Sequence, residues 1–436
     1  MLRLLKGNLY YFKGIIYAFC CLNKLTIFAY KIKTIMSKEF SFADLNKEMS
    51  KHSTYGDTLD KSTISEIDHF IPTGNYHLNA CLTGSLFGGY PNNRAVALAG
   101  PSGTGKTYLT LNAVKQAQDM GYYIVYYDSE NAVDRDLVEK FGIDSTKFRY
   151  EPCNTVQEFR SSVTALTDTL IAQQNKGLTI PKVMIVLDSA GNLATQKEID
   201  DAKSGSDKAD MTRSKLLKST FRILMTKLGI VKVPFLFTNH TYQTQDLFSQ
   251  TVSGGGTGPE YAASIILFLG KAKLKEGTEQ TGIIVSAKPN KNRFAKPTPI
   301  KFHISFNKGM NPYIGLEEYI SWDNCGIQRG RFLTEGQFDK LKEAERAECR
   351  KHIYTKDEKE VTVYFQPADT ARKIAVAHLN DLVDLNHLFT PRVMTREVLE
   401  KLEPIVSAKF KYGVDELDVN DIDLMLDSDD EDQETN

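Results

Sequence analysis

Short apolar runs alternate with longer segments of helical periodicity through the middle of this 436-residue chain. Runs of this length, bounded by polar or glycine residues, are typical of strands buried in a sheet. The segments between them, such as 108–120, place apolar residues three and four positions apart, which predicts amphipathic helices. This alternation predicts an α/β fold with a mostly parallel, twisted sheet and helices on both faces. The predicted strands are 94–99, 122–128, 182–188, 233–237, 264–270, 281–288 and 299–306.

The first predicted strand leads into a glycine-rich turn. Residues 100–107 read GPSGTGKT and run directly into a helical pattern, which is the strand, loop and helix order of a phosphate-binding loop. Glycines let backbone N–H groups point at phosphate oxygens, the lysine reaches the terminal phosphates, and the threonine hydroxyl binds Mg²⁺. The pattern therefore predicts ATP and Mg²⁺ as cofactors. The predicted nucleotide-binding residues here are Gly100, Pro101, Ser102, Gly103, Thr104, Gly105, Lys106, Thr107 and Tyr108.

Two further strands end next to carboxylates. Glu130 follows the strand at 122–128, where a carboxylate can orient water against a γ-phosphate; the other interpretation is the cap of the following helix. Asp188 ends the strand at 182–188 and is the predicted partner of Thr107 in holding Mg²⁺.

A long connection follows the strand at 233–237. Residues 239–262 show no clear periodicity and contain the sequence GGGTG. A connection of this length inside a compact domain is uncommon and is usually functional or disordered.

Charge is distributed unevenly, although the formal net charge is only −1. Residues 415–436 have eleven acidic residues and no basic one, whereas residues 1–35 have six basic residues and no acidic one. An acidic tail on a modestly basic body is found in proteins that handle nucleic acid, and equally often it only solubilises a protein. Six scattered cysteines without metal-ligand spacing argue against a zinc site or a disulfide framework and favour a reducing, cytoplasmic setting.

The two ends of the chain differ from its middle. Residues 1–35 are apolar and basic, but they contain no unbroken stretch near the ~20 residues of a membrane helix. They fit a signal or transit peptide, or a mis-called extension upstream of Met36, which we favour. Residues 36–75 contain a short amphipathic helical pattern. Residues 317–412 are predicted to form a mixed, largely helical C-terminal domain, followed by an acidic, disordered tail at 413–436.

The order of these segments resembles that of the RecA-type recombinases, and in particular the UvsX recombinases of large tailed phages. The phosphate-binding loop alone is shared by many NTPases, but the ordered set of segments is specific. The resemblance implies a RecA-like phosphate-loop ATPase core at 76–316 and an N-terminal oligomerisation element at 36–75. The matching segments are AGPSGTGKTYLTL, YYDSE, VLDSAGNLATQKEIDDA, DMTRSKLLKSTFRIL, FTNHT, SGGGTGPEYAA and GMNPYIGL.

The resemblance also implies roles for single residues at the nucleotide. Glu130 matches the glutamate that activates the attacking water. Lys106, Thr107 and Asp188 match the phosphate and Mg²⁺ residues. His240, in the segment TNHT, matches a polar sensor of the γ-phosphate, where bacterial RecA has a glutamine.

Other matches concern the neighbouring subunit and the base. Lys291 and Arg293 match paired cations that reach ATP bound by the next subunit, with Lys288 as the alternative, and this arrangement would make hydrolysis depend on filament formation. Asp134 matches a residue on the adenine side, whereas Leu137 stands where bacterial RecA stacks a tyrosine.

Two segments match the DNA-binding loops of the family, at about 200–213 and 241–259. Arg213 is the predicted phosphate contact of the first loop. Phe248, in the second loop, is either a residue that stacks on bases or an anchor of the loop to the core. Glycines would allow close backbone approach to DNA, and those predicted to do so are Gly254, Gly255, Gly256 and Gly258.

The resemblance therefore implies a DNA-dependent ATPase that forms a filament on single-stranded DNA. It would pair that strand with homologous double-stranded DNA and exchange strands during recombination, repair and recombination-dependent replication. The implied partners are DNA, further copies of the chain, a single-strand-binding protein and a loader or mediator protein, with no membrane; the implied location is the cytoplasm, that of the host if the chain is phage-encoded. Two alternatives stay open: a hexameric DNA helicase of the same fold, and a phosphate-loop ATPase scaffold that binds no nucleic acid.

Overall fold

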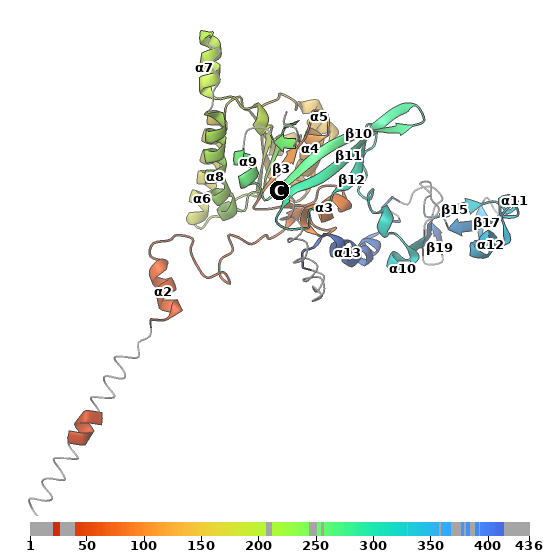
Figure 1. Ribbon diagram of the computed structural model, residues 1–436, viewed down its shortest axis with the longest axis horizontal. Helices are drawn as coiled ribbons and strands as arrows, with labels where there is room; N and C mark the ends of the chain where they lie inside the picture. Colours follow the sequence, from red (N-terminus) through yellow and green to blue (C-terminus); the bar gives the residue numbers. More distant parts are fainter. Residues whose placement is uncertain are drawn as a thin grey trace, which may run out of the picture. The chain divides into compact units, whose positions relative to one another are not determined.

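A computed structural model of the chain is shown in Figure 1. The chain divides into two compact units, Met1–Glu66 and Ile67–Asn436. The structure describes residues 21–26, 40–205, 212–243, 251–253, 257–328, 330–356, 359–367, 376–378, 381–383, 389–391 and 393–413.

Within the first unit, α2 (Phe42–Met49) forms where the amphipathic pattern predicts a helix. Ser41 and Asp44 begin it with a capping box, in which each side chain accepts a hydrogen bond from the other residue's backbone N–H. No residue of α2 is buried, and its apolar side chains Phe42, Leu45 and Met49 are 71%, 43% and 58% exposed. The described part of this unit therefore leaves the apolar face of α2 uncovered.

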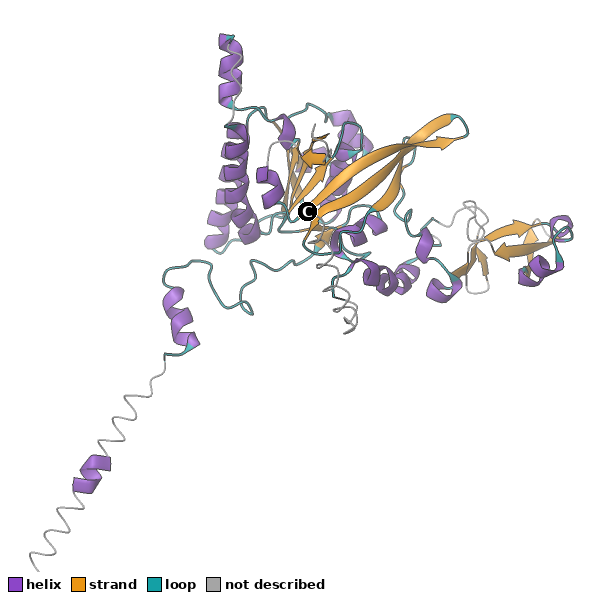
Figure 2. Cartoon of the chain, viewed as in Figure 1, coloured by secondary structure: helices purple, strands orange, loops and turns teal. Residues whose placement is uncertain are grey.

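The second unit is built on a nine-stranded sheet, drawn in orange in Figure 2. Its six strands from β10 to β5 are parallel to their neighbours, and β11, β12 and β13 add an antiparallel edge. This confirms the prediction of an α/β fold with a mostly parallel sheet. In spatial order the strands are β13 (Gly309–Met310), β12 (Ile300–Ser305), β11 (Glu279–Asn292), β10 (Ile265–Glu276), β3 (Ala95–Ala99), β7 (Phe235–Asn239), β6 (Val183–Asp188), β4 (Tyr123–Asp128) and β5 (Phe148–Pro152).

Strands β10 and β11 form a long antiparallel hairpin, paired from Ile265 and Asn292 to Glu276 and Glu279. Its outer half extends beyond the rest of the sheet (Figure 2). Gly277 adopts a positive φ of 64° at the turn, a conformation that glycine reaches without a steric penalty.

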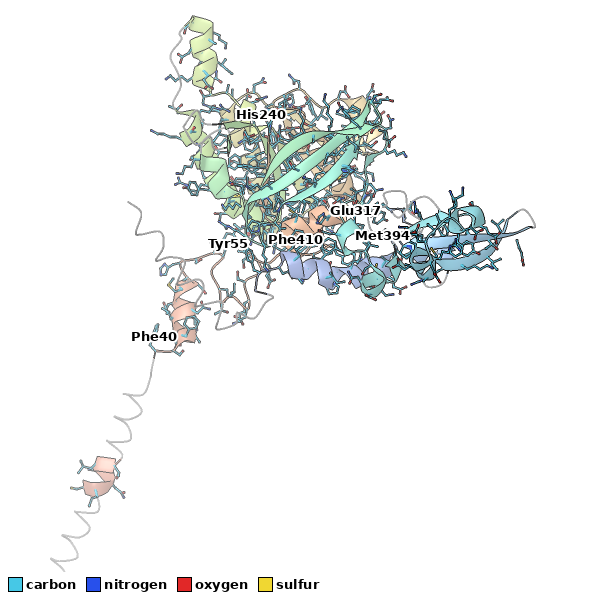
Figure 3. All side chains as sticks on the ribbon, turned by 45° about the vertical axis from the view of Figure 1, so that its right-hand side comes forward. Phe40, Tyr55, His240, Glu317, Met394 and Phe410 are labelled. Atoms are coloured by element: carbon cyan, nitrogen blue, oxygen red, sulfur yellow. The ribbon has the colours of Figure 1, made fainter. Side chains whose placement is uncertain are left out.

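Helices cover both faces of the sheet. One face carries α3 (Tyr76–Thr83), α4 (Lys106–Asp119) and α13 (Arg396–Phe410), and the other carries α6 (Val156–Asn175) and α8 (Arg213–Val231). Helix α13 comes from the far end of the chain, yet its Phe410 is fully buried and meets the ring of His77 in α3 edge-on at 5.6 Å (Figure 3). The C-terminal helix therefore belongs to the packing of the core.

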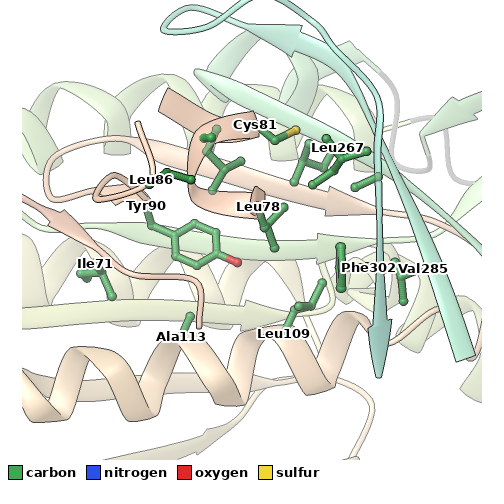
Figure 4. Close-up of a cluster of buried hydrophobic side chains, with 14 of the residues drawn as sticks. Ile71, Leu78, Cys81, Leu86, Tyr90, Leu109, Ala113, Leu267, Val285 and Phe302 are labelled. Atoms are coloured by element: carbon green, nitrogen blue, oxygen red, sulfur yellow. The ribbon is translucent and has the colours of Figure 1, made fainter. Parts of the chain in front are cut away.

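The buried strands explain why two helical layers are needed. Val96 and Leu98 of β3 point into the cluster that contains α3 and α4, whereas Ala95 and Ala97 point into the cluster that contains α6 and α8. A strand alternates its side chains between two faces, so a strand that is apolar at every position must be covered on both. Figure 4 shows the first of these clusters.

The remaining elements are short. They are β1 (Phe70–Ile71), β2 (Tyr90–Pro91), α5 (Arg135–Lys140), η1 (Ser145–Lys147), η2 (Ala190–Asn192), α7 (Gln196–Ser204), β8 (Thr241–Gln243), β9 (Thr251–Ser253), α9 (Thr257–Ala262), η3 (Glu317–Tyr319), α10 (Trp322–Cys325), β14 (Ile327–Gln328), β15 (Gly330–Leu333), α11 (Glu335–Phe338), α12 (Glu343–Glu348), β16 (Arg350–Lys356), β17 (Lys359–Pro367), β18 (Val376–His378) and β19 (Asp381–Val383).

The prediction of a largely helical segment at 317–412 is wrong. Its described part contains two three-stranded antiparallel sheets, with the orders β14-β18-β19 and β15-β17-β16. Helices α11 and α12 each end within two turns, and strand β16 begins at Arg350, soon after α12. Pairing with β17, which is rich in β-branched and aromatic residues, outweighs the helical periodicity there.

The two predicted DNA-binding loops are more structured than expected at their ends. Asp200 to Ser204 belong to α7, which starts with a capping box between Thr195 and Glu198. In the second loop, β8 pairs with β9, and α9 begins at Thr257. Residues 206–211, 244–250 and 254–256 lie outside the described residues.

Among the helices of the described residues, none combines the length and the apolar character needed to cross a membrane.

We predict that Phe410→Ala lowers the free energy of unfolding of the second unit by about 3–5 kcal/mol, because a buried aromatic side chain is lost and leaves a cavity. Guanidinium denaturation followed by circular dichroism measures this change. Glu400→Ala is the control on the exposed side of the same helix, with an expected effect within about 0.5 kcal/mol. Equal effects of the two substitutions would show that α13 is not part of the core.

Candidate nucleotide-binding and catalytic site

The phosphate-binding loop joins the end of β3 to the start of α4. Gly103 and Gly105 adopt positive φ angles of 72° and 87°, so the loop needs glycine at both positions. The ammonium of Lys106 is buried under the loop and donates to the carbonyl oxygens of Gly100 and Pro101 at 2.9 and 3.0 Å. Burial lowers the pKa of Lys106, although the nearby carboxylates oppose this shift. The loop therefore holds its lysine at the N-terminus of a helix, where anions bind favourably.

Asp188 is the buried carboxylate of the site. It ends β6 and accepts hydrogen bonds from the hydroxyl groups of Thr107 at 2.8 Å, Tyr126 at 2.9 Å and Thr238. Burial raises the pKa of the Asp188 carboxyl, and these three hydrogen bonds act in the opposite direction. The structure thus brings together Thr107 and Asp188, which the sequence predicted as the Mg²⁺ residues.

This donor set fits Mg²⁺ bound with a nucleotide. Mg²⁺ in such sites usually takes one or two protein oxygens and completes its shell with phosphate oxygens and water. The hydroxyl of Thr107 and the carboxylate of Asp188 offer such oxygens beside the phosphate-binding loop. Within the described residues, no group of three or more His, Cys, Asp or Glu side chains forms a metal cage.

Glu130 lies at the same edge of the sheet, just after β4. Its Oε1 accepts a hydrogen bond from Ser189 Oγ at 2.7 Å and lies 2.9 Å from His240 Nε2. The side chains of Glu130 and His240 are each 24% exposed, so both are accessible to solvent but held by neighbours. Figure 3 shows His240 at the edge of the core. The structure therefore places the predicted catalytic carboxylate in contact with the predicted sensor.

The alternative role of Glu130 as a helix cap is wrong. Asp134 is the N-cap of α5, and its side chain accepts a hydrogen bond from the backbone N–H of Leu137 at 2.8 Å. The backbone N–H of Glu130 instead donates to Asp128 at 2.9 Å. Asp134, the predicted adenine-side residue, is thus occupied with capping, and its own side chain lies at the surface.

Sequence reasoning missed several residues that shape the site. Tyr126 and Thr238 bind Asp188 from the two strands that flank β6. Ser189 binds Glu130, and its backbone N–H donates to the hydroxyl of Ser129 at 2.9 Å. All of these are polar positions at or near the carboxyl ends of predicted strands, and that position is the signal by which they could have been found.

A groove of about 640 Å³ opens beside the phosphate-binding loop. The loop residues Gly103 and Gly105 line one side, and the hairpin strands β10 and β11 with Phe306 line the other. Tyr108 lies in the groove, where its hydroxyl accepts a hydrogen bond from the backbone N–H of Met310 at 2.8 Å. The lining of the groove is predominantly apolar, as in most small-molecule sites.

The structure does not bring Lys291 and Arg293 to the phosphate-binding loop of their own chain. Lys291 lies at the end of β11 that pairs with the first residues of β10, and Arg293 directly follows that strand, whereas the loop follows the last residue of β3. Lys291 Nζ donates to the carbonyl oxygen of Tyr261 at 3.2 Å, and Arg293 and the alternative, Lys288, are exposed.

The predicted DNA-binding residues are only partly described. Arg213 begins α8, and its guanidinium donates to the carbonyl oxygens of Ala190 and Gly191. Gly258 is buried against α8, where an added Cβ would lie 2.7 Å from Cα of Lys218, so close helix packing alone requires glycine there. Phe248, Gly254, Gly255 and Gly256 lie outside the described residues.

Fold and site together define a class. The glycine-rich loop at the end of β3, its lysine and threonine, and the carboxylates at the ends of β4 and β6 are the parts of a phosphate-loop nucleotide-binding protein with an α/β core.

Comparison with known proteins gives the family. The family model described as RecA N-terminal domain matches residues 37–311, which is more than half of the chain. This chain therefore belongs to the RecA family. Proteins of this family bind ATP and are DNA-dependent ATPases.

Individual relatives agree with this assignment. The chain is 33% identical over 242 residues to the "Recombination and repair protein" of Enterobacteria phage T4, a match that covers 55% of this chain and 60% of the phage protein. It is 27% identical over 304 residues to "Protein RecA" of Paenarthrobacter aurescens (strain TC1), covering 69% of this chain and 81% of that protein. It is 28% identical over 246 residues to "Protein RecA" of Bacteroides thetaiotaomicron, covering 55% and 70%.

We predict that Lys106→Ala reduces ATP hydrolysis on the order of 10²–10³-fold, because the site loses its buried cation at the phosphates. Steady-state hydrolysis and binding of a fluorescent nucleotide measure the effect. Lys115→Ala, on the same helix but paired with Asp119 at the surface, is the control with near-normal activity. Normal hydrolysis by Lys106→Ala would reject the assignment of the phosphate site.

Proposed function

We propose that this chain is an ATP-dependent DNA recombinase, which forms a filament on single-stranded DNA, pairs it with homologous duplex and exchanges strands. The observation that carries the proposal is the contact between Glu130 and His240 at 2.9 Å. It joins the carboxylate at the nucleotide edge to the residue from which the segment 241–259 departs. This segment is the predicted DNA-binding loop. One hydrogen bond therefore connects the nucleotide site with the base of the loop that is proposed to bind DNA.

In the proposed reaction each residue of the candidate site has one role. Lys106 and the loop N–H groups bind the phosphates, and Thr107 and Asp188 would hold Mg²⁺. Bound Mg²⁺ neutralises charge on the phosphate oxygens. Glu130 orients the attacking water and accepts its proton as the oxygen bonds to the γ-phosphorus and the bond to ADP breaks. Ser189 keeps the Glu130 carboxylate in place.

The sensor role of His240 follows from its two neighbours. Its ring contacts Glu130, and its backbone leads directly into β8, which pairs with β9. A change at the γ-phosphate that moves Glu130 would therefore act on the base of the loop. DNA bound at the loop would act on Glu130 by the same route, since coupling between two sites is reciprocal.

Filament formation is supported by two surfaces of the chain. Lys291 and Arg293 lie away from the phosphate-binding loop of their own chain, which suits a role toward a nucleotide held by a neighbouring copy. Helix α2 presents Phe42 and Met49 uncovered, which suits packing against another copy. We propose that residues 36–75 are the oligomerisation element.

We predict that Glu130→Gln slows ATP hydrolysis by about 10²–10⁴-fold while ATP affinity stays within about twofold. Glutamine can still accept the hydrogen bond from Ser189, so the geometry persists and only the proton acceptor is lost. Single-turnover hydrolysis and nucleotide binding separate these quantities. Glu139→Gln, an exposed change on α5, is the control. Unaltered turnover of Glu130→Gln would exclude its role as the general base.

We predict that single-stranded DNA stimulates ATP hydrolysis and that raising salt from about 50 to 200 mM removes most of this stimulation, because DNA binding releases counterions. Hydrolysis by the full chain with and without an oligonucleotide across a salt series is the measurement. A rate unaffected by DNA would reject the proposal and favour the ATPase scaffold. Stimulation without strand exchange between homologous molecules would favour the helicase.

A further inference from the structure

Arg213 makes contacts that differ from those of a DNA phosphate ligand. It is the first residue of α8, directly after the predicted loop at 200–213, yet its guanidinium turns toward the core and donates to the carbonyl oxygens of Ala190 and Gly191. The side chain is half-buried, and its buried Nε has no hydrogen-bond partner among the described residues. One guanidinium nitrogen, Nη2, makes both contacts, with the carbonyl oxygen of Ala190 at 3.5 Å, and so connects this turn to the start of α8.

The turn that Arg213 holds is continuous with the catalytic edge. Ala190 and Gly191 form η2 and directly follow Asp188 and Ser189. Ser189 donates to Glu130 at 2.7 Å, and the backbone N–H of Asn192 returns to the Ser189 carbonyl oxygen at 3.3 Å. The orientation of η2 therefore sets the position of the hydroxyl group that holds the catalytic carboxylate.

The same turn also touches the sensor. A Cβ added to Gly191 would lie 2.8 Å from Oδ1 of Asn239 and 3.5 Å from the backbone nitrogen of His240. Gly191 thus packs against the end of β7, with its carbonyl oxygen bound by Arg213. One turn contacts the start of α8, the end of β7 and, through Ser189, Glu130.

We propose that Arg213 is a positioning residue for Glu130, acting through the turn at Ala190–Asn192, and that it couples the start of α8 to ATP hydrolysis. The proposal rests on the proposed function, because the change it transmits is DNA binding at the segment before α8. The sequence pattern suggested only that Arg213 contacts a DNA phosphate. The two roles predict different kinetics.

The test measures ATP hydrolysis by the full chain without DNA. Arg213→Gln should lower kcat by about tenfold and leave KM for ATP within about twofold, since the phosphate site is untouched. Arg213→Lys keeps a charged N–H donor but changes the length and shape of the side chain, and its kcat should fall between those of Arg213→Gln and the unaltered chain. Arg222→Gln removes an exposed charge from the same helix and serves as the matched control, with unchanged kcat.

A double-mutant cycle shows whether the effect passes through Ser189. Ser189→Ala removes the hydrogen bond between this turn and Glu130. If Arg213 acts on Glu130 by holding the turn, Arg213→Gln should then lower kcat by less than about twofold in the Ser189→Ala background. Equal costs in both backgrounds would overturn the proposal. Thermal unfolding identifies misfolded variants, and Arg213→Lys carries the test if Arg213→Gln does not fold.

DNA affinity separates this role from phosphate binding. Binding to a fluorescent single-stranded oligonucleotide across a salt series should be nearly unchanged in Arg213→Gln. Normal DNA-free kcat with weaker binding and a salt slope shallower by about one would assign Arg213 to a phosphate contact and overturn the proposal. If DNA does not stimulate even the unaltered chain, the proposed function fails, while the DNA-free kcat still decides whether Arg213 positions Glu130.

Discussion

The buried carboxylate of Asp188 is the constraint on which the site depends. A carboxylate taken out of water must find hydrogen-bond donors, since an unpaired buried charge costs several kcal/mol. Its donors come from three different elements: Thr107 from α4, Tyr126 from β4 and Thr238 from β7. The hydrogen bonds of this one side chain therefore depend on the strand order and on the position of α4 relative to the carboxyl ends of the strands.

Glu130 is more exposed to solvent than Asp188. It is partly exposed, and its partners Ser189 and His240 each belong to a segment that continues away from the sheet. The site thus pairs a buried carboxylate with one that is accessible to water, and phosphoryl transfer needs both charge at the phosphates and a group that reaches the attacking water. Because Ser189 directly follows Asp188, the hydroxyl group that binds Glu130 is positioned by the end of β6.

The sequence was sufficient for the sheet and the phosphate site because these depend on local signals. Runs such as 95–99 are apolar at every position, and the loop after them needs glycine at 103 and 105 for reasons of backbone geometry. The partners Tyr126 and Thr238 could not be predicted, because the strand order decides which side chains lie close enough to bind Asp188. Within 317–412, which were predicted to be mixed and largely helical, residues 350–356 instead form a strand that pairs with β17, and periodicity does not encode such a contact.

Gly258 and Arg213 show that a match to a family motif does not by itself assign the role of each residue within the motif. Both fall in segments that match DNA-binding loops, yet in the described structure Gly258 packs against the backbone of Lys218, and Arg213 binds two carbonyl groups next to the catalytic edge. A residue at the base of a loop is constrained by the scaffold as well as by any ligand of the loop. Such positions are well placed to transmit binding, because a change in the loop reaches the scaffold through them first.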